Sequence, residues 1–130
     1  MKKTLFFLVL AARIVSCYTS SAQMNITLKS HVPFTGFQLS NIWGYAANSK
    51  EYALVGHSGG MTVVDVTDPA NPDSLFTAPG SNSIWREVRS KGTYAFVTTE
   101  GGGGLQIVNL SDLPNSIQYE NWTGDSAIAG

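Results

Sequence analysis

YALVGHSGGMTVVDVTD, residues 52–68, is the stretch that decides the fold, because both of its ends return further along the chain. Its first part, YALV, is echoed by YAFV at residues 94–97, an offset of 42. Its last part, VVDVTD, is echoed by IVNLSD at residues 107–112, an offset of 44. The change of offset indicates that the second glycine-rich connection is two residues longer. A period of this length with strand-like content is typical of one propeller blade per repeat.

The sequence of each repeat predicts about four short strands and no helix. Along residues 51–56, Tyr52 and Leu54 point to one face and Ala53 and Val55 to the other. Residues 61–66 are almost continuously apolar, which predicts a strand buried on both faces. The other predicted strands are residues 74–77 in the first repeat and residues 93–98, 105–110 and 117–122 in the second, and the opening segments 41–45 and 83–88 complete the count of about four in each repeat.

The predicted fold class is all-β, an incomplete β-propeller of a little over two four-stranded blades. A small β-sandwich of about eight strands is the alternative. The same order of strands and turns in both repeats favours the blades. On this basis the chain divides into a lead-in segment (23–40), a first blade repeat (41–80), a second blade repeat (81–124) and the start of a truncated third repeat (125–130).

Residues 1–22 are predicted to be a secretory signal peptide. Lys2 and Lys3 precede a short apolar run, and small residues up to Ala22 are suitable for cleavage. Cys17 also fits a lipobox, so a lipid anchor there is the alternative to cleavage after Ala22. Cleavage after Ala22 would leave five of the eight basic residues and all nine acidic ones, a net charge of −4 instead of −1. An acidic exported domain without a basic cluster argues against nucleic acid and anionic membrane surfaces as partners.

Several spaced motifs resemble the LVIVD repeat of bacterial surface β-propellers, notably residues 52–56 and 60–72. The segments IWG (42–44), EYALVG (51–56) and WREV (85–88) resemble the choice-of-anchor B group of these proteins. The resemblance covers about residues 41–130, although Asn109 replaces Asp65 and Leu113 replaces Pro69 in the second repeat. It implies an exported protein that is longer than this chain and carries a C-terminal surface anchor, so we expect an N-terminal fragment. No catalytic residues come with it.

The candidate ligand contacts are Trp43, Trp85, Arg86 and Glu87. Trp43 and Trp85 are 42 residues apart, which predicts equivalent positions in the segments that open each repeat. In a propeller these segments lie near the central axis, where an aromatic ring can stack on a sugar or a peptide side chain. Packing between blades is the alternative role for both tryptophans.

Other residues suggest chemistry less specifically. His57 and Ser58 are adjacent in a predicted hairpin, which does not supply the geometry of a nucleophile and its base, so we expect an exposed turn histidine. Asp65, Asp68 and Asp73 favour turn capping over a calcium site, because the pattern of a calcium loop is missing. Glu100 and the four glycines that follow it predict a flexible hairpin and not a phosphate loop.

We therefore expect a non-catalytic, secreted or cell-surface binding module for protein or glycan, with no cofactor and no metal. The membrane would be reached only through a lipid on Cys17 or a C-terminal anchor. Two alternatives remain open. One is part of a propeller hydrolase or lyase whose active site lies in missing blades, and the other is a structural surface component.

Overall fold

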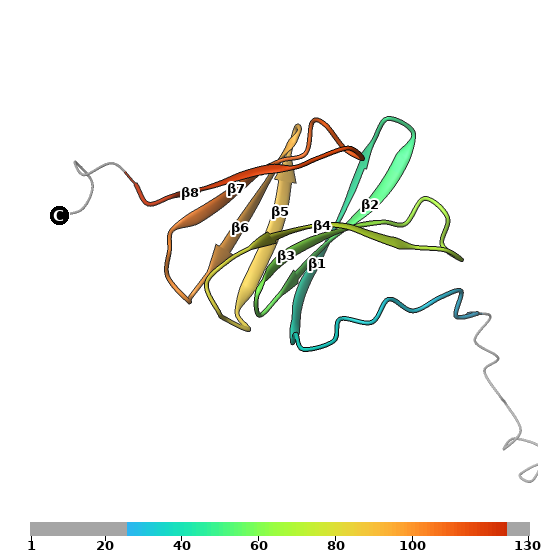
Figure 1. Ribbon diagram of the computed structural model, residues 1–130, viewed down its shortest axis with the longest axis horizontal. Helices are drawn as coiled ribbons and strands as arrows, with labels where there is room; N and C mark the ends of the chain where they lie inside the picture. The colour runs from blue at the N-terminus through green and yellow to red at the C-terminus, as the bar shows by residue number, and fades with distance from the viewer. Residues whose placement is uncertain (1–25, 125–130) are drawn as a thin grey trace, which may run out of the picture.

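The structure is a computed structural model that describes residues 26–124, which form two four-stranded antiparallel sheets (Figure 1). The first sheet contains β1 (Leu39–Ala47), β2 (Lys50–His57), β3 (Gly60–Asp65) and β4 (Asp73–Pro79). The second contains β5 (Arg86–Lys91), β6 (Tyr94–Thr99), β7 (Leu105–Asn109) and β8 (Gln118–Trp122). In both sheets the strands lie in chain order, so each repeat is a simple meander. The prediction of an all-β chain with four strands in each repeat is confirmed.

The predictions for residues 1–22, including Cys17, and for residues 125–130 lie outside the described residues. Within the described part of the chain, no helix is long and apolar enough to cross a membrane.

The strand registers show how the two repeats correspond. Tyr52 lies opposite Asp65 in the first sheet, and Tyr94 lies opposite Asn109 in the second. These two pairs differ by the offsets of 42 and 44, so the two extra residues do lie in the β6–β7 connection. Gly60 and Gly104 confirm the alignment, because both have positive φ and a Cβ on either would lie 2.2 Å from a backbone oxygen of the neighbouring strand.

The hairpin that opens each repeat breaks this correspondence. Tyr45 lies opposite Tyr52, whereas Lys91 lies opposite Tyr94, because β1 and β2 continue for two more residue pairs before they turn. By register, the residue that corresponds to Trp43 is Arg89. Trp85 lies just before β5. The prediction that Trp43 and Trp85 occupy equivalent positions is therefore wrong, since the spacing of 42 does not apply to the opening strand.

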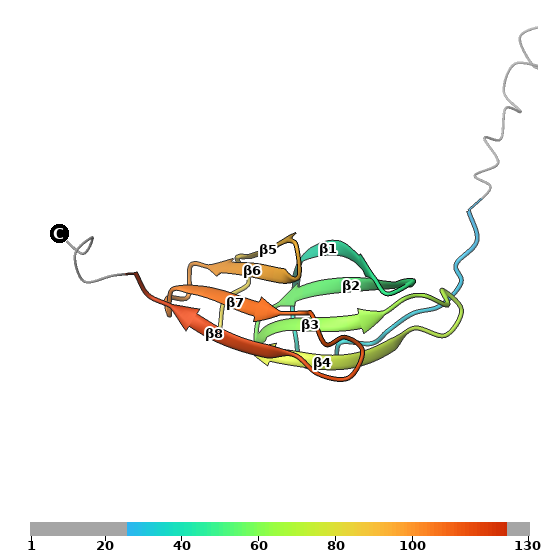
Figure 2. The same ribbon diagram turned by 90° about the horizontal axis from the view of Figure 1, so that it is seen from above.

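The two sheets pack face to face, and β1 and β2 contact β5 (Figure 2). The core between them consists of buried apolar side chains that are at most 2% exposed. They are Tyr52, Leu54, Met61, Val63 and Ala78 from the first sheet, Val88, Ala95, Val97 and Val108 from the second, and Leu110 and Leu113 from the β7–β8 connection.

The lead-in segment covers part of the other face of the first sheet. The rings of Phe34 and Phe37 lie 6.0 and 4.3 Å from the ring of His57, centroid to centroid. Further along, the Ser30 hydroxyl donates a hydrogen bond to the Pro69 carbonyl at 2.7 Å. Residues 60–64 are all buried, as predicted for a strand covered on both faces. The prediction of an exposed His57 is wrong, because its side chain is completely buried under the lead-in aromatic rings.

Candidate functional site

Three glycine-containing connections meet at one end of the two sheets, which we call the loop end. They are the β2–β3 connection (58–59), the link from β4 to β5 (80–85) and the β6–β7 connection (100–104). In the link, Gly80 N donates to Gly59 O at 2.9 Å and Ser83 N donates to Ser58 O at 3.1 Å. A Cβ on Gly101 would lie 2.9 Å from the Asn82 backbone oxygen. Close backbone packing therefore requires small residues here and fixes the link between the two sheets.

Trp85 projects from this fixed backbone. Its amide N donates to Ser83 Oγ at 3.0 Å, and its carbonyl accepts a hydrogen bond from Glu100 N at 3.4 Å. Its side chain is nevertheless 67% exposed. The main chain is held on both sides while the indole faces solvent, an arrangement that suits an aromatic contact with a ligand.

Two shallow hollows of similar size flank Trp85, and each is lined by it. One has a volume of about 350 Å³ and is lined by Trp85, Arg86, Glu87, Thr98, Thr99 and Glu100. The other has a volume of about 360 Å³ and is lined by Gln38, Leu39, Ser40, Ile84, Trp85 and Arg86. The first presents two carboxylates and two hydroxyls beside the ring, so it offers oxygen acceptors next to an aromatic surface.

Arg86 and Glu87 point to opposite faces of β5, as neighbouring residues of a strand do. Arg86 is 6% exposed, and its guanidinium donates to the carbonyls of His57 at 3.0 Å and Ser81 at 2.5 Å. Burial lowers the pKa of this guanidinium. Glu87 is exposed and forms an ion pair with Arg89. Arg86 thus joins the two sheets, and of the predicted pair only the Glu87 side chain faces solvent.

Trp43 lies apart from the loop end, at the contact between β1 and β5. Its indole Nε1 donates to Ser90 Oγ at 2.9 Å. The guanidinium of Arg89 lies 4.5 Å from the centre of its ring, within the range of a cation–π interaction. The structure therefore brings Trp85, Arg86 and Glu87 together and places Trp43 in the packing between sheets.

His57 has a structural set of partners. Its Nδ1 accepts a hydrogen bond from Gly59 N at 3.2 Å, and its Nε2 lies 2.9 Å from Thr62 Oγ1. The Gly59 bond places the ring proton on Nε2, so the neutral imidazole donates to Thr62. Burial, and to a lesser degree the charge of Arg86, lower the pKa of His57. Its burial could have been inferred from the strand alternation, since Ala53, Val55 and His57 share one face of β2.

Asp65 and Asp68 cap turns, as predicted, whereas Asp73 is the first residue of β4. Asp65 Oδ1 accepts a hydrogen bond from Thr67 N at 3.0 Å, and Asp68 Oδ1 accepts one from Ala70 N at 2.9 Å. A hydrogen bond from Lys50 Nζ at 2.6 Å, together with those from Thr67, lowers the pKa of Asp65 to about 2. Among the described residues, no group of three His, Cys, Asp or Glu side chains could hold a metal ion.

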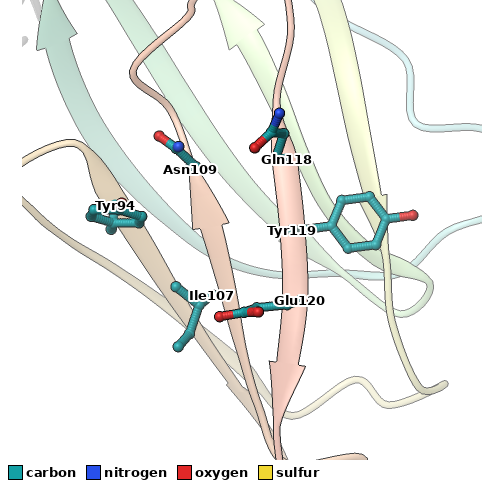
Figure 3. Close-up of a pocket in the computed structure, with 6 residues that line it drawn as sticks. All are labelled: Tyr94, Ile107, Asn109, Gln118, Tyr119 and Glu120. Carbon is teal, nitrogen blue, oxygen red and sulfur yellow. The ribbon is translucent and has the colours of Figure 1, made fainter.

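A third hollow, which the sequence did not indicate, lies on the outer face of the second sheet (Figure 3). It has a volume of about 290 Å³ and is lined by Tyr94, Ile107, Asn109, Gln118, Tyr119 and Glu120. Figure 3 shows Tyr119 directed away from Tyr94 and Ile107, so it borders the hollow from its edge.

The comparison with protein families matches residues 47–77 to the LVIVD repeat. This range covers β2, β3 and most of β4, so the first sheet is built on an LVIVD repeat. No curated protein and no solved structure matches the chain.

Proposed function

We propose that this protein is an exported, non-catalytic binding module in which LVIVD repeats form blades of a β-propeller. The repeat match supports a protein of the cell surface, and two meander sheets packed face to face are what neighbouring blades require. In this proposal the loop end is the binding surface, and an extracellular glycan or protein is the ligand.

The exposed indole of Trp85 on its fixed backbone is the observation that carries the proposal. Because hydrogen bonds already hold the backbone that carries the ring, a ligand that stacks on it costs little backbone freedom. Beside it, Glu87 and Glu100 can accept hydrogen bonds from sugar hydroxyls or from a basic peptide side chain. A pyranose ring, or a basic side chain of a protein, can both stack on the indole and donate hydrogen bonds to these carboxylates.

Trp85→Ala tests this role. The wild-type chain and the variant are applied to a glycan array and to an array of basic and neutral peptides. The glycans or peptides that bind are then titrated in solution by fluorescence. We expect binding to be lost in Trp85→Ala and kept in Tyr119→Ala, a matched control that removes an exposed aromatic ring from β8. Equal binding by wild type and Trp85→Ala would contradict the proposal. Turnover of a glycan or ester that depends on Trp85 or Glu87 would instead favour an enzyme.

Export is tested separately on the protein produced in a bacterial host. We propose that the chain leaves the cytoplasm and is cleaved after Ala22, so the exported protein would begin at Gln23. Mass spectrometry of the exported product distinguishes this N-terminus from a lipidated Cys17. Retention of the intact N-terminus inside the cell would contradict export.

A further inference from the structure

The outer face of the second sheet repeats a face that is buried in the first. Tyr52 and Leu54 of β2 are 1% and 0% exposed, because the second sheet covers them. By register, Tyr94 and Phe96 of β6 occupy the same positions in the second sheet. Tyr94 is 44% exposed, and within the described residues no third sheet covers it.

The neighbouring strand continues the pattern. Met61 and Val63 of β3 correspond to Leu105 and Ile107 of β7, so the centre of the face stays apolar in both sheets. At the edge, Trp122 takes the place of Ala78 and is 50% exposed. We call the five residues Tyr94, Phe96, Leu105, Ile107 and Trp122 the docking face.

Two polar side chains show how a sheet is held on such a face. From the second sheet, Arg86 donates to the His57 carbonyl at 3.0 Å and Gln106 Nε2 donates to the Pro79 carbonyl at 2.7 Å. Both side chains are at most 6% exposed, so these two hydrogen bonds join the sheets at the loop end and are shielded from solvent. Thr99 and Thr123 occupy the places of His57 and Pro79 in the second repeat.

We propose that the docking face receives a third sheet of the same repeat type, which an arginine and a glutamine at the positions of Arg86 and Gln106 seat by donating to the carbonyls of Thr99 and Thr123. The occupant is a further LVIVD-type repeat whose inner face is lined by small aliphatic residues. The inference rests on the repeat architecture of the proposed function and not on ligand contact by Trp85.

A second copy of the chain is a poorer occupant. The small aliphatic side chains that fit this type of face are Val88, Ala95, Val97 and Val108, and they are already buried against the first sheet of their own chain. The rim also differs from that of the first sheet, since Lys91 replaces Tyr45 and Glu120 replaces Phe76. A suitable third sheet must leave these two charges in solvent or meet them with opposite charges.

The chain can supply its own test sheet. A second copy of residues 81–124 is fused after Gly124 in place of residues 125–130, which reproduces the natural Gly80–Ser81 junction. In the added copy Tyr94 is replaced by Phe, so that the original Tyr94 gives its own peptide in hydroxyl-radical footprinting with mass spectrometry. We expect labelling of the original Tyr94 to fall to the level of Tyr52, and the extended chain to unfold in one transition at higher temperature.

Two variants of the extended chain make the outcome specific. Arg86→Gln with Gln106→Leu in the added copy removes the two anchors, and Ile107→Glu in the original copy places a charge on the docking face; each should restore labelling of Tyr94. Labelling that stays at the level of the unextended chain would overturn the proposal. So would protection of Tyr94 in a dimer of the unextended chain, detected by light scattering. Glycan or peptide binding through Trp85, measured on the same proteins, tests the proposed function independently.

Discussion

Tyr52 and Tyr94 occupy the same position in two sheets of the same topology, yet one is 1% exposed and the other 44%. Their strands are alike, with YALV in β2 and YAFV in β6. The difference therefore comes from what lies above each sheet, since the second sheet covers Tyr52. Whether this face of a sheet is buried therefore depends on whether another sheet packs against it, more than on the sequence of its strands.

The two faces also differ at their rims. Around the buried face of the first sheet lie aromatic residues, such as Trp43 and Tyr45, which pack against the core. The corresponding residues of the second sheet are Arg89 and Lys91, whose charges suit a water-exposed rim. The apolar centre is thus shared by both sheets, whereas the rim is specific to each.

The largest contrast is expected from truncating the equivalent residues Leu54 and Phe96. Leu54→Ala should lower the free energy of unfolding by about 2–5 kcal/mol, because its side chain is completely buried between the sheets. Phe96→Ala removes a larger side chain that is only half-buried, so we expect a loss of about 1–2 kcal/mol. Urea denaturation of both variants measures the difference. Equal losses would show that the two faces are buried alike in solution.

The sequence predicted the repeat units better than their contacts. The echoes in residues 52–68 located β2, β3, β6 and β7, and even the longer second connection, because strand alternation and glycine turns are local properties. The predicted equivalence of Trp43 and Trp85 was wrong because the β1–β2 hairpin is four residues longer than the β5–β6 hairpin. The spacing between the two tryptophans does not reveal this difference. His57 was assigned to the turn, although the alternation of β2 places it on the apolar face of Ala53 and Val55; the rings that cover it, Phe34 and Phe37, lie some twenty residues away in a segment without strand pattern.

The second contrast concerns two arginines of β5. Arg86→Met should cost about 1–3 kcal/mol, because the carbonyls of His57 and Ser81 lose the donor that the buried Arg86 side chain supplies. Arg89→Met removes an exposed ion pair with Glu87 and a contact with the Trp43 ring, which together should be worth at most about 1 kcal/mol. Denaturation of both variants in moderate salt provides the test. A larger loss for Arg89 would contradict the role of Arg86 as the anchor between the sheets.

The third contrast is between pH values and depends on the lowered pKa of His57. The unfolded chain binds a proton on this residue more readily than the folded chain, so its contribution to stability is complete above the ordinary pKa of 6.5 and falls as the pH decreases. The slope from one such group is at most about 1.4 kcal/mol per pH unit. Protonation of Nδ1 would replace its hydrogen bond from Gly59 N–H with a repulsive contact between two donors. Denaturation at pH 7.5 and 5.5 should show this loss, and His57→Gln should reduce it; an NMR titration of the His57 ring at an ordinary pKa would argue against it.

The smallest expected effect comes from replacing Asp65 of the first repeat by asparagine, the residue that the second repeat has at this position. Asp65→Asn keeps an oxygen that can accept from Thr67 N, as Asn109 accepts from Ser111 N at 3.0 Å. It loses the ion pair with Lys50, whose side chain is 39% exposed, so the cost at pH 7 should be at most about 1 kcal/mol.

This cost should itself depend on pH. Because hydrogen bonds from Lys50 and Thr67 lower the pKa of Asp65 from 3.8 to about 2, the stabilisation is present above pH 3.8 and is lost as the pH falls toward 2. Wild type and Asp65→Asn should therefore converge in acid when their free energies of unfolding are measured at pH 7, 4 and 2. Asn109→Asp is the matched control, since the second hairpin lacks the residue pairs that include Lys50 and β6 carries no lysine in its place. A gain in stability from Asn109→Asp at pH 7 would mean that the carboxylate acts through the turn alone, and that the ion pair is not what distinguishes the two repeats.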